Sequence, residues 1–234
     1  MAGVADSVRP IHVAGVIDAA EARLLIDCGV RHVGFPLALD FHEEDLRVPE
    51  AAGIVADLAG LATFFLITYL DTARAIVELC RALRVATVQL HGPIDVGELD
   101  KLRREWPALS VIKSLIVRGD NLEALADEAA CLAPFVDTFI TDTFDPATGA
   151  CGATGKTHDW TISRRLVDRC PRPVILAGGL DPDNVRAAIS AVRPAGVDVH
   201  TGVEGPDGRK QRRLVERFVA EASAGFRECP RDGV

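Results

Sequence analysis

The sequence predicts an α/β protein, a single (β/α)8 TIM barrel, and three observations carry this prediction. Short β-branched runs alternate with longer stretches of helical period along nearly the whole chain, which is typical of a parallel sheet with crossover helices. The unit recurs eight times, the number that closes a barrel. The length of 234 residues suits one such domain.

Each predicted strand is a short run rich in β-branched residues, followed by a helical segment. The barrel is expected to span residues 11–224, with solvated tails at 1–10 and 225–234. We expect strands near residues 11–14, 31–35, 62–67, 85–90, 109–115, 136–141, 173–177 and 196–200.

Capping residues support several of the predicted helices. Asp18 is expected to cap the first helix, with Glu21 completing a capping box and Gly29 ending it. Asp71 is the expected cap of the third helix, and Asp181, before a proline, that of the seventh.

Two connections are long, residues 36–47 after the second strand and 142–159 after the sixth. Both follow the carboxyl end of a strand, the face on which barrels place their active sites. We therefore expect function at these loops.

The composition excludes some classes of partner. Hydrophobic residues make up 48% of the chain, enough for a core, and the formal net charge of -8 disfavours nucleic acid and anionic membranes as partners. The apolar stretch 51–70 is interrupted by Asp57, so a membrane span is not expected. Scattered cysteines without a CxxC pair, and no apolar core before residue 11, favour a cytoplasmic protein, monomeric or homodimeric.

Glycine-rich turns follow the last two predicted strands. Gly178 and Gly179 follow the seventh strand, and Thr201 and Gly202 follow the eighth. These two loops commonly bind phosphate in barrels, because glycine lets backbone N–H groups approach an anion closely. The alternative is that the glycines only allow tight turns.

Five motifs in order give the chain a recognisable pattern. They are VQLHG at 88–92, VIKS at 111–114, GATGKTHDW at 152–160, LAGGLDPDNV at 176–185 and VDVHTGVE at 197–204. With them the chain resembles phosphoribosylanthranilate isomerase, the tryptophan-pathway enzyme that opens a phosphoribosylamine and rearranges it to an aminoketone. The resemblance implies an aldose-ketose isomerase that uses no cofactor and no metal.

The resemblance also implies catalytic residues. The family's general acid is an aspartate that ends the sixth strand, where this chain has Asp142. A loop or helix-capping aspartate is the alternative.

The family's general base is a cysteine in a Lys-x-Cys-Gly sequence on the first strand, and Ala14 stands in its place. His12 points to the same side of that strand, about 6 to 7 Å deeper, and is one substitute. Cys151, in the long sixth loop, is the other. A buried structural histidine and an unactivated loop cysteine are the alternatives.

The family's carboxylate-binding arginine is also missing, because Asp45 falls at its position. Arg47 is the nearest replacement, although this acidic run is also typical of a solvated loop. His42, Glu43 and Asp45 could ligate a metal, but their spacing is not diagnostic, and no metal is expected. Other side chains are expected to contact substrate, with Lys113 pointing into the barrel: His91, Lys113, His158 and Asp198.

Three functions fit this pattern. The chain is an isomerase of this type with a relocated base, a sister enzyme acting on another phosphorylated sugar, or a noncatalytic phosphosugar-binding protein. The retained motifs lie where the family binds the phosphate, and the missing family residues lie where it binds the anthranilate. This pattern is expected when the phosphate group of the substrate is kept and its other half changes.

Overall fold

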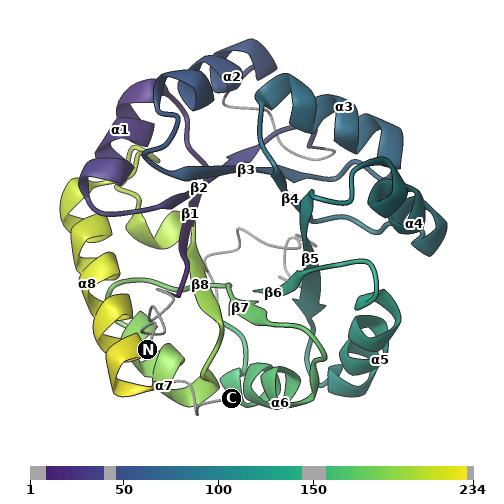
Figure 1. The fold of residues 1–234 in the computed structure, drawn as a ribbon. Helices are drawn as coiled ribbons and strands as arrows, with labels where there is room; N and C mark the ends of the chain where they lie inside the picture. Colours follow the sequence, from purple (N-terminus) through teal and green to yellow (C-terminus); the bar gives the residue numbers. More distant parts are fainter. Residues whose placement is uncertain (1–8, 40–45, 144–156, 231–234) are drawn as a thin grey trace, which may run out of the picture.

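A computed structural model describes residues 9–39, 46–143 and 157–230, which form a closed barrel surrounded by helices (Figure 1). Neighbouring strands are parallel all the way round, and β1 closes the barrel by pairing with β8. The strands are β1 (Ile11–Ala14), β2 (His32–Pro36), β3 (Thr63–Thr68), β4 (Thr87–Leu90), β5 (Ser110–Val117), β6 (Thr138–Thr143), β7 (Val174–Leu176) and β8 (Gly196–Val199).

The helices form the outer layer and follow the strands in turn. The predicted fold is confirmed, and α8 continues past residue 224, the expected end of the barrel. The helices are α1 (Ala19–Asp27), α2 (Val48–Asp57), α3 (Ala73–Leu83), α4 (Val96–Glu105), α5 (Leu122–Leu132), α6 (Trp160–Arg169), α7 (Val185–Val192) and α8 (Arg212–Glu228), and a short 3-10 helix, η1 (Thr201–Val203), precedes α8.

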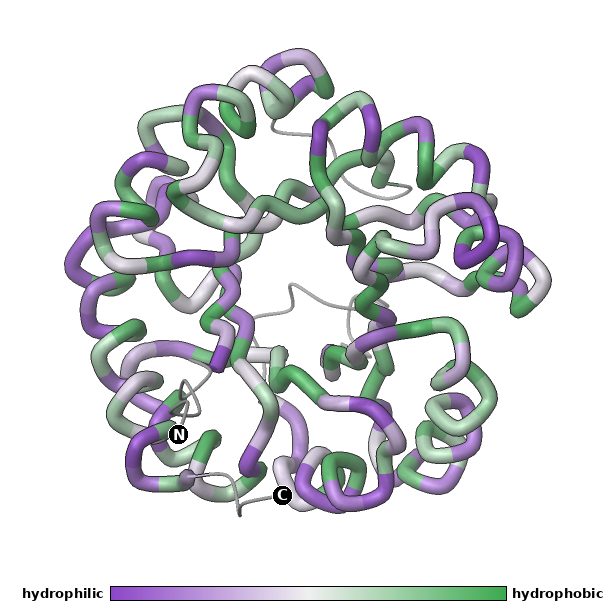
Figure 2. The backbone as a smooth tube through the Cα atoms, in the orientation of Figure 1, coloured by the Kyte–Doolittle hydropathy of each residue, from purple (hydrophilic) through white to green (hydrophobic). Residues whose placement is uncertain are grey.

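The core has two parts, because strand side chains alternate between the barrel interior and the helices. One large cluster lies between the strands and the helices and includes Val13, Val111 and Val197. Smaller clusters fill the interior, among them Ala14 with Phe65 and Ile67. Figure 2 shows apolar residues along the strands and hydrophilic residues toward the outside.

Local capping agrees with the sequence at the first helix and differs at the third. Asp18 accepts a hydrogen bond from the Glu21 N–H at 2.8 Å. The predicted capping box is not formed, because the Glu21 carboxylate accepts from the Ile17 N–H at 3.0 Å and not from the N–H of Asp18. Gly29 has φ of +90° where α1 ends, a conformation that favours glycine. The prediction for Asp71 is wrong. Thr72 is the N-cap of α3, and a carboxylate from α4, Glu98, accepts from the Ala73 N–H at 2.9 Å.

At the seventh helix, Asp181 caps a turn and not the helix itself. Its Oδ1 accepts from the Asp183 and Asn184 N–H groups, and α7 begins after Asn184. Within the described ranges, no helix is both long and apolar enough to cross a membrane.

Candidate active site

The carboxyl ends of the strands gather a set of inward-facing polar side chains. Asp142 lies near the end of β6, Asp198 lies on β8, and His91 directly follows β4. Each alternates with residues of the outer core, such as Val197 and Val199 around Asp198, and therefore faces the interior.

Asp142 is enclosed by protein and hydrogen bonded. Its Oδ1 accepts from the Thr143 N–H at 2.7 Å, and its Oδ2 lies 3.7 Å from the His91 Nδ1. Burial raises the pKa of this carboxyl, and His91 and the Thr143 N–H oppose the rise. A raised pKa favours the protonated form of the carboxyl, which is the form that a general acid requires.

His91 is fixed in place by its neighbours. Its Nδ1 lies 3.3 Å from the Ser114 Oγ, and its ring packs edge-on against Tyr69 with centroids 4.9 Å apart. The predicted substrate residues His91 and Asp198 therefore both face the barrel mouth with Asp142.

Asp198 is a second buried carboxyl of the mouth. Burial, and then the charge of Asp142, raise the pKa of Asp198 to about 7, while Lys210 lowers it. Its Oδ1 has no hydrogen-bond partner among the described residues. The effect of the Asp142 charge on the pKa of Asp198 indicates that the two carboxyls share one site.

His12 lies deeper, in the wall formed by β1. Its ring packs against Phe65 with centroids 4.8 Å apart and against His32 at 5.2 Å. Burial, and then His32, lower the pKa of His12 to about 3, so the ring is neutral at physiological pH. Its Nδ1 faces the Asp198 Oδ1 at 3.9 Å.

The two glycine turns lie against each other at the ends of β7 and β8. Gly178 and Gly179 have φ of +106° and +63°. Both values favour glycine, and no backbone oxygen of the described chain accepts from either N–H group. At Gly202 a β-carbon would stand 1.9 Å from the Leu180 oxygen. The turns are therefore packed as one structure, with N–H groups available to an anion.

A buried ion pair supports the loop after β8, and no sequence motif indicated it. The Lys210 side chain is fully buried, and its Nζ lies 2.5 Å from the Glu204 Oε1. Glu21 accepts from the Lys210 N–H at 2.7 Å. These contacts hold the segment after η1 against α1.

His158 lies beneath the Gly178 turn and bonds through both ring nitrogens. Its Nδ1 is 2.9 Å from the Thr143 Oγ1, and its Nε2 bonds to the buried Ser163 hydroxyl. Burial lowers the pKa of His158 to about 4, so its ring is neutral. A β-carbon at Gly178 would meet the Thr143 Oγ1 at 2.2 Å. His158 therefore supports the turn from below through Thr143.

The expectation that Lys113 points into the barrel is wrong. Its neighbours on the same strand face, Val111 and Leu115, belong to the cluster between strands and helices. The Lys113 Nζ donates to the Ser114 carbonyl at 2.9 Å. Burial lowers the pKa of Lys113 to about 8, while the negative charge of Glu128, on α5, raises it.

Arg47 begins α2 and is engaged locally. Its side chain is 83% exposed and pairs with Glu50, whose carboxylate also accepts from the Arg47 N–H. His42, Glu43, Asp45 and Cys151 lie outside the described residues. No three His, Cys, Asp or Glu side chains of residues 9–39, 46–143 and 157–230 gather as metal ligands.

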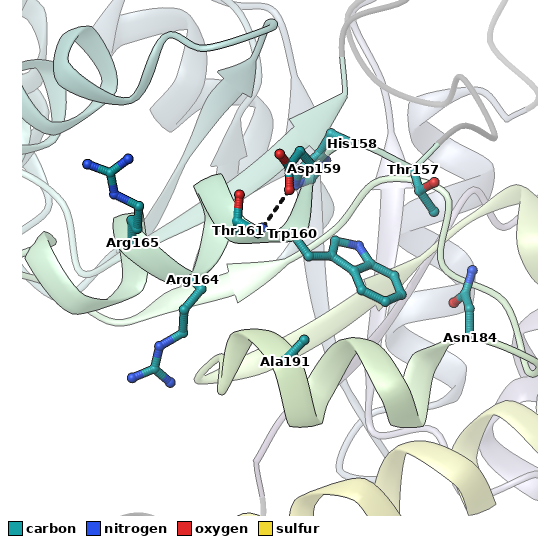
Figure 3. Close-up of a pocket in the computed structure, with 9 residues that line it drawn as sticks. All are labelled: Thr157, His158, Asp159, Trp160, Thr161, Arg164, Arg165, Asn184 and Ala191. Atoms are coloured by element: carbon teal, nitrogen blue, oxygen red, sulfur yellow. Dashed lines mark hydrogen bonds between the residues drawn. The ribbon is translucent and has the colours of Figure 1, made fainter.

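A separate pocket of about 800 Å³ lies outside the barrel mouth, between α6 and α7 (Figure 3). In Figure 3, Trp160 extends over α7 toward Asn184 and Ala191. Asn184 donates from its Nδ2 to the Gly179 oxygen at 2.9 Å. The pocket therefore borders the outer side of the glycine turn.

Comparison with known proteins gives one consistent family. Residues 71–221 match the family described as N-(5'-phosphoribosyl)anthranilate (PRA) isomerase. A Methanosarcina mazei protein named N-(5'-phosphoribosyl)anthranilate isomerase 2 is 36% identical over 220 residues, which cover 92% of this chain and 95% of that protein.

Solved structures agree. The crystal structure of phosphoribosyl anthranilate isomerase from Thermotoga maritima has a TM-score of 0.78 at 26% identity, covering 92% of this chain and 98% of that one. Another crystal structure holds an isomerase with reduced 1-(o-carboxyphenylamino)-1-deoxyribulose 5-phosphate. Its TM-score is 0.75 at 25% identity, with 92% and 98% coverage.

Proposed function

The chain belongs to the N-(5'-phosphoribosyl)anthranilate isomerase family, and we propose that it opens this phosphoribosylamine and isomerises it to the aminoketone in tryptophan biosynthesis. The observation that carries the proposal is that the paired glycine turns and the buried carboxyl of Asp142 share one end of the barrel. A substrate held there by its phosphate would extend over the inward-facing side chains.

The phosphate binds between Gly178-Gly179 and Thr201-Gly202. The positive φ values of the first pair and the close packing of Gly202 on Leu180 support this assignment. Backbone N–H groups bind an anion without a cationic side chain, which suits a chain of net charge -8.

Asp142 is the general acid of ring opening. It protonates the ring oxygen, the bond from that oxygen to C1 breaks, and the nitrogen lone pair forms the iminium. Burial raises the pKa of Asp142 and so favours the protonated form that this step uses. His91 and Asp198 contact the sugar hydroxyls from β4 and β8, on either side of Asp142.

A base must next remove the C2 proton, and the sequence offers His12 and Cys151 for this role. A pKa of about 3 makes His12 a weak proton acceptor. Cys151 lies outside the described residues.

Arg47 remains the proposed partner of the anthranilate carboxylate, since it is the cation nearest to the missing arginine in the sequence and its side chain is 83% exposed. That role requires it to exchange Glu50 for the substrate. We also propose a cytoplasmic protein, monomeric or homodimeric. The scattered cysteines and the acidic net charge support this setting.

The direct test is turnover of N-(5'-phosphoribosyl)anthranilate by the purified protein, together with complementation of a tryptophan auxotroph that lacks this isomerase. Growth and turnover are expected. A folded protein that fails in both assays while still binding phosphate would instead support a sister activity on another phosphorylated sugar.

A further inference from the structure

We propose that Asp198 is the general base of the isomerisation and takes the role of the cysteine that Ala14 replaces, with His12 as its positioning residue. The inference rests on the proposed function and names a catalytic residue for it.

The first argument is placement. β8 pairs directly with β1, and Asp198 is the register partner of His12. Adjacent strands lie about 4.8 Å apart, so the Asp198 carboxylate faces the interior next to β1, at the level of His12 and two residues below position 14. Asp198 is also the more accessible of the pair, with its side chain 12% exposed and that of His12 4%.

The second argument is the path of the substrate. The glycine turn that includes Gly202 follows β8 itself, so a phosphate bound there places the attached sugar above β8. Asp142 faces the same interior from β6, with β7 between them. The sugar therefore lies between two carboxyls, which is the arrangement that an acid and a base on one substrate require.

The third argument is availability. The Asp198 Oδ1 is buried and has no hydrogen-bond partner in the part of the chain that the structure describes. A buried acceptor without a partner is costly, and this cost favours a protonated carboxyl whose proton on Oδ1 points toward His12.

His12 supplies the partner for that proton. The His12 Nδ1 is also buried and unpaired among the described residues, 3.9 Å from the Asp198 Oδ1. A neutral imidazole protonated on Nε2 presents Nδ1 as an acceptor, so protonated Asp198 can donate to it once the two side chains approach by about 1 Å. A hydrogen bond to the neutral carboxyl strengthens the base.

The proton balance closes within the site. After Asp142 has opened the ring, Asp198 removes the C2 proton. The C–H electron pair forms the C1=C2 bond, and the iminium π pair returns to nitrogen. Asp198 then protonates C1, and the C2 hydroxyl proton passes to the Asp142 carboxylate. C1 is reduced and C2 is oxidised in the same molecule, so no external oxidant or reductant is needed and both carboxyls regain their starting states.

The electrostatics fit these roles. Burial and the charge of Asp142 raise the pKa of Asp198 to about 7, and Lys210 limits the rise. The neutral His12 adds no charge at this pH. A base with a pKa near the working pH combines availability with strength.

The test compares wild type, Asp198→Asn, Ala14→Cys and the double variant with N-(5'-phosphoribosyl)anthranilate as substrate. Asp198→Asn should lower kcat at least about a hundredfold with a smaller change in KM. Adding Ala14→Cys to the Asp198→Asn variant should raise kcat at least about tenfold, because it returns a thiol to the position of the family's cysteine. Asp100→Asn, the same substitution on the outer helix α4, where the carboxylate pairs with Arg104, is the matched control and should keep kcat.

The outcomes separate the two proposals. A wild type without turnover overturns the proposed function and this inference with it. An active wild type with an Asp198→Asn variant of unchanged kcat and raised KM, or with no rescue by Ala14→Cys, overturns only this inference.

A second measurement covers an Asp198→Asn variant that does not fold. In His12→Phe, where the acceptor is lost, the acidic limb of the kcat pH profile should move to lower pH. If the acidic limb of the kcat pH profile stays at the wild-type pH, His12 is not the positioning residue for a base at Asp198.

Discussion

Gly202 packs directly on the carbonyl oxygen of Leu180, where a β-carbon would stand 1.9 Å from that oxygen. The contact joins the turns after β7 and β8, so Gly202→Ala must displace one of them. We expect KM to rise about tenfold or more and the stabilisation by millimolar phosphate to be lost, both measured on the purified variant.

Gly53→Ala is the control, because Gly53 lies in α2 and a β-carbon there meets nothing within 4 Å. Alanine should stabilise this helix by about 0.5–1 kcal/mol and leave KM unchanged. Equal KM values for Gly202→Ala and wild type would exclude the turn pair as the phosphate site.

Asp142→Asn keeps the shape of the side chain and removes its proton. Loss of a general acid costs about a hundredfold to ten-thousandfold in rate, so kcat should fall at least about a hundredfold. The melting temperature should change little, because an amide oxygen at this position can still accept from the Thr143 N–H. Turnover close to that of the wild type would remove Asp142 from the mechanism.

Asp198 also makes stability depend on pH. The pKa of this carboxyl is about 7 in the fold, raised by burial, and about 4 in the unfolded chain. Between these values the folded state binds the proton and the unfolded state does not, so the free energy of unfolding decreases as pH rises through this window. The contribution is present below pH 4 and lost above pH 7, and it amounts to at most about 4 kcal/mol.

Melting curves of wild type and Asp198→Asn at pH 5 and pH 8 measure this contribution. The melting temperature of the variant should be higher relative to that of the wild type at pH 8 than at pH 5, since the amide of the variant does not ionise. Parallel pH dependence of the two proteins would contradict the raised pKa.

Lys113→Met tests the corrected placement of Lys113. Because the amine lies between β5 and α5, kcat and KM should stay within about twofold of wild type. The melting temperature at pH 7 should be equal or higher, since burial penalises the charged amine, whose pKa is lowered to about 8. A large rise in KM would show that Lys113 contacts the substrate and would contradict this placement.

The strand order was predictable because parallel strands buried on both faces read as apolar runs separated by helical segments. The same property hides which face a residue takes. Lys113 lies in such a run, between Ile112 and Ser114, and no alternation of polar and apolar residues indicates its direction. Asp142 and the glycine turns were selected from sequence by position and motif, and their roles stay predictions.

Contacts between distant segments left no local signal. Glu98 caps α3 from the next helix, so Asp71 was the nearest plausible choice in sequence and the wrong one. The pKa values of His12 and Asp198 follow from burial and from charges on other strands, which no motif encodes.

The closure of the barrel by β1 and β8 has a consequence for the order of events during folding. The register pair His12 and Asp198 joins the first strand to the last, and contacts so far apart in sequence form slowly, since they close the longest loop of the chain. A nascent chain that has completed β6 already carries Asp142 but has neither the opposing carboxyl nor the glycine turns of β7 and β8. Catalytic competence therefore arises only when the first and last strands pair, and regain of activity should be the slowest phase of refolding.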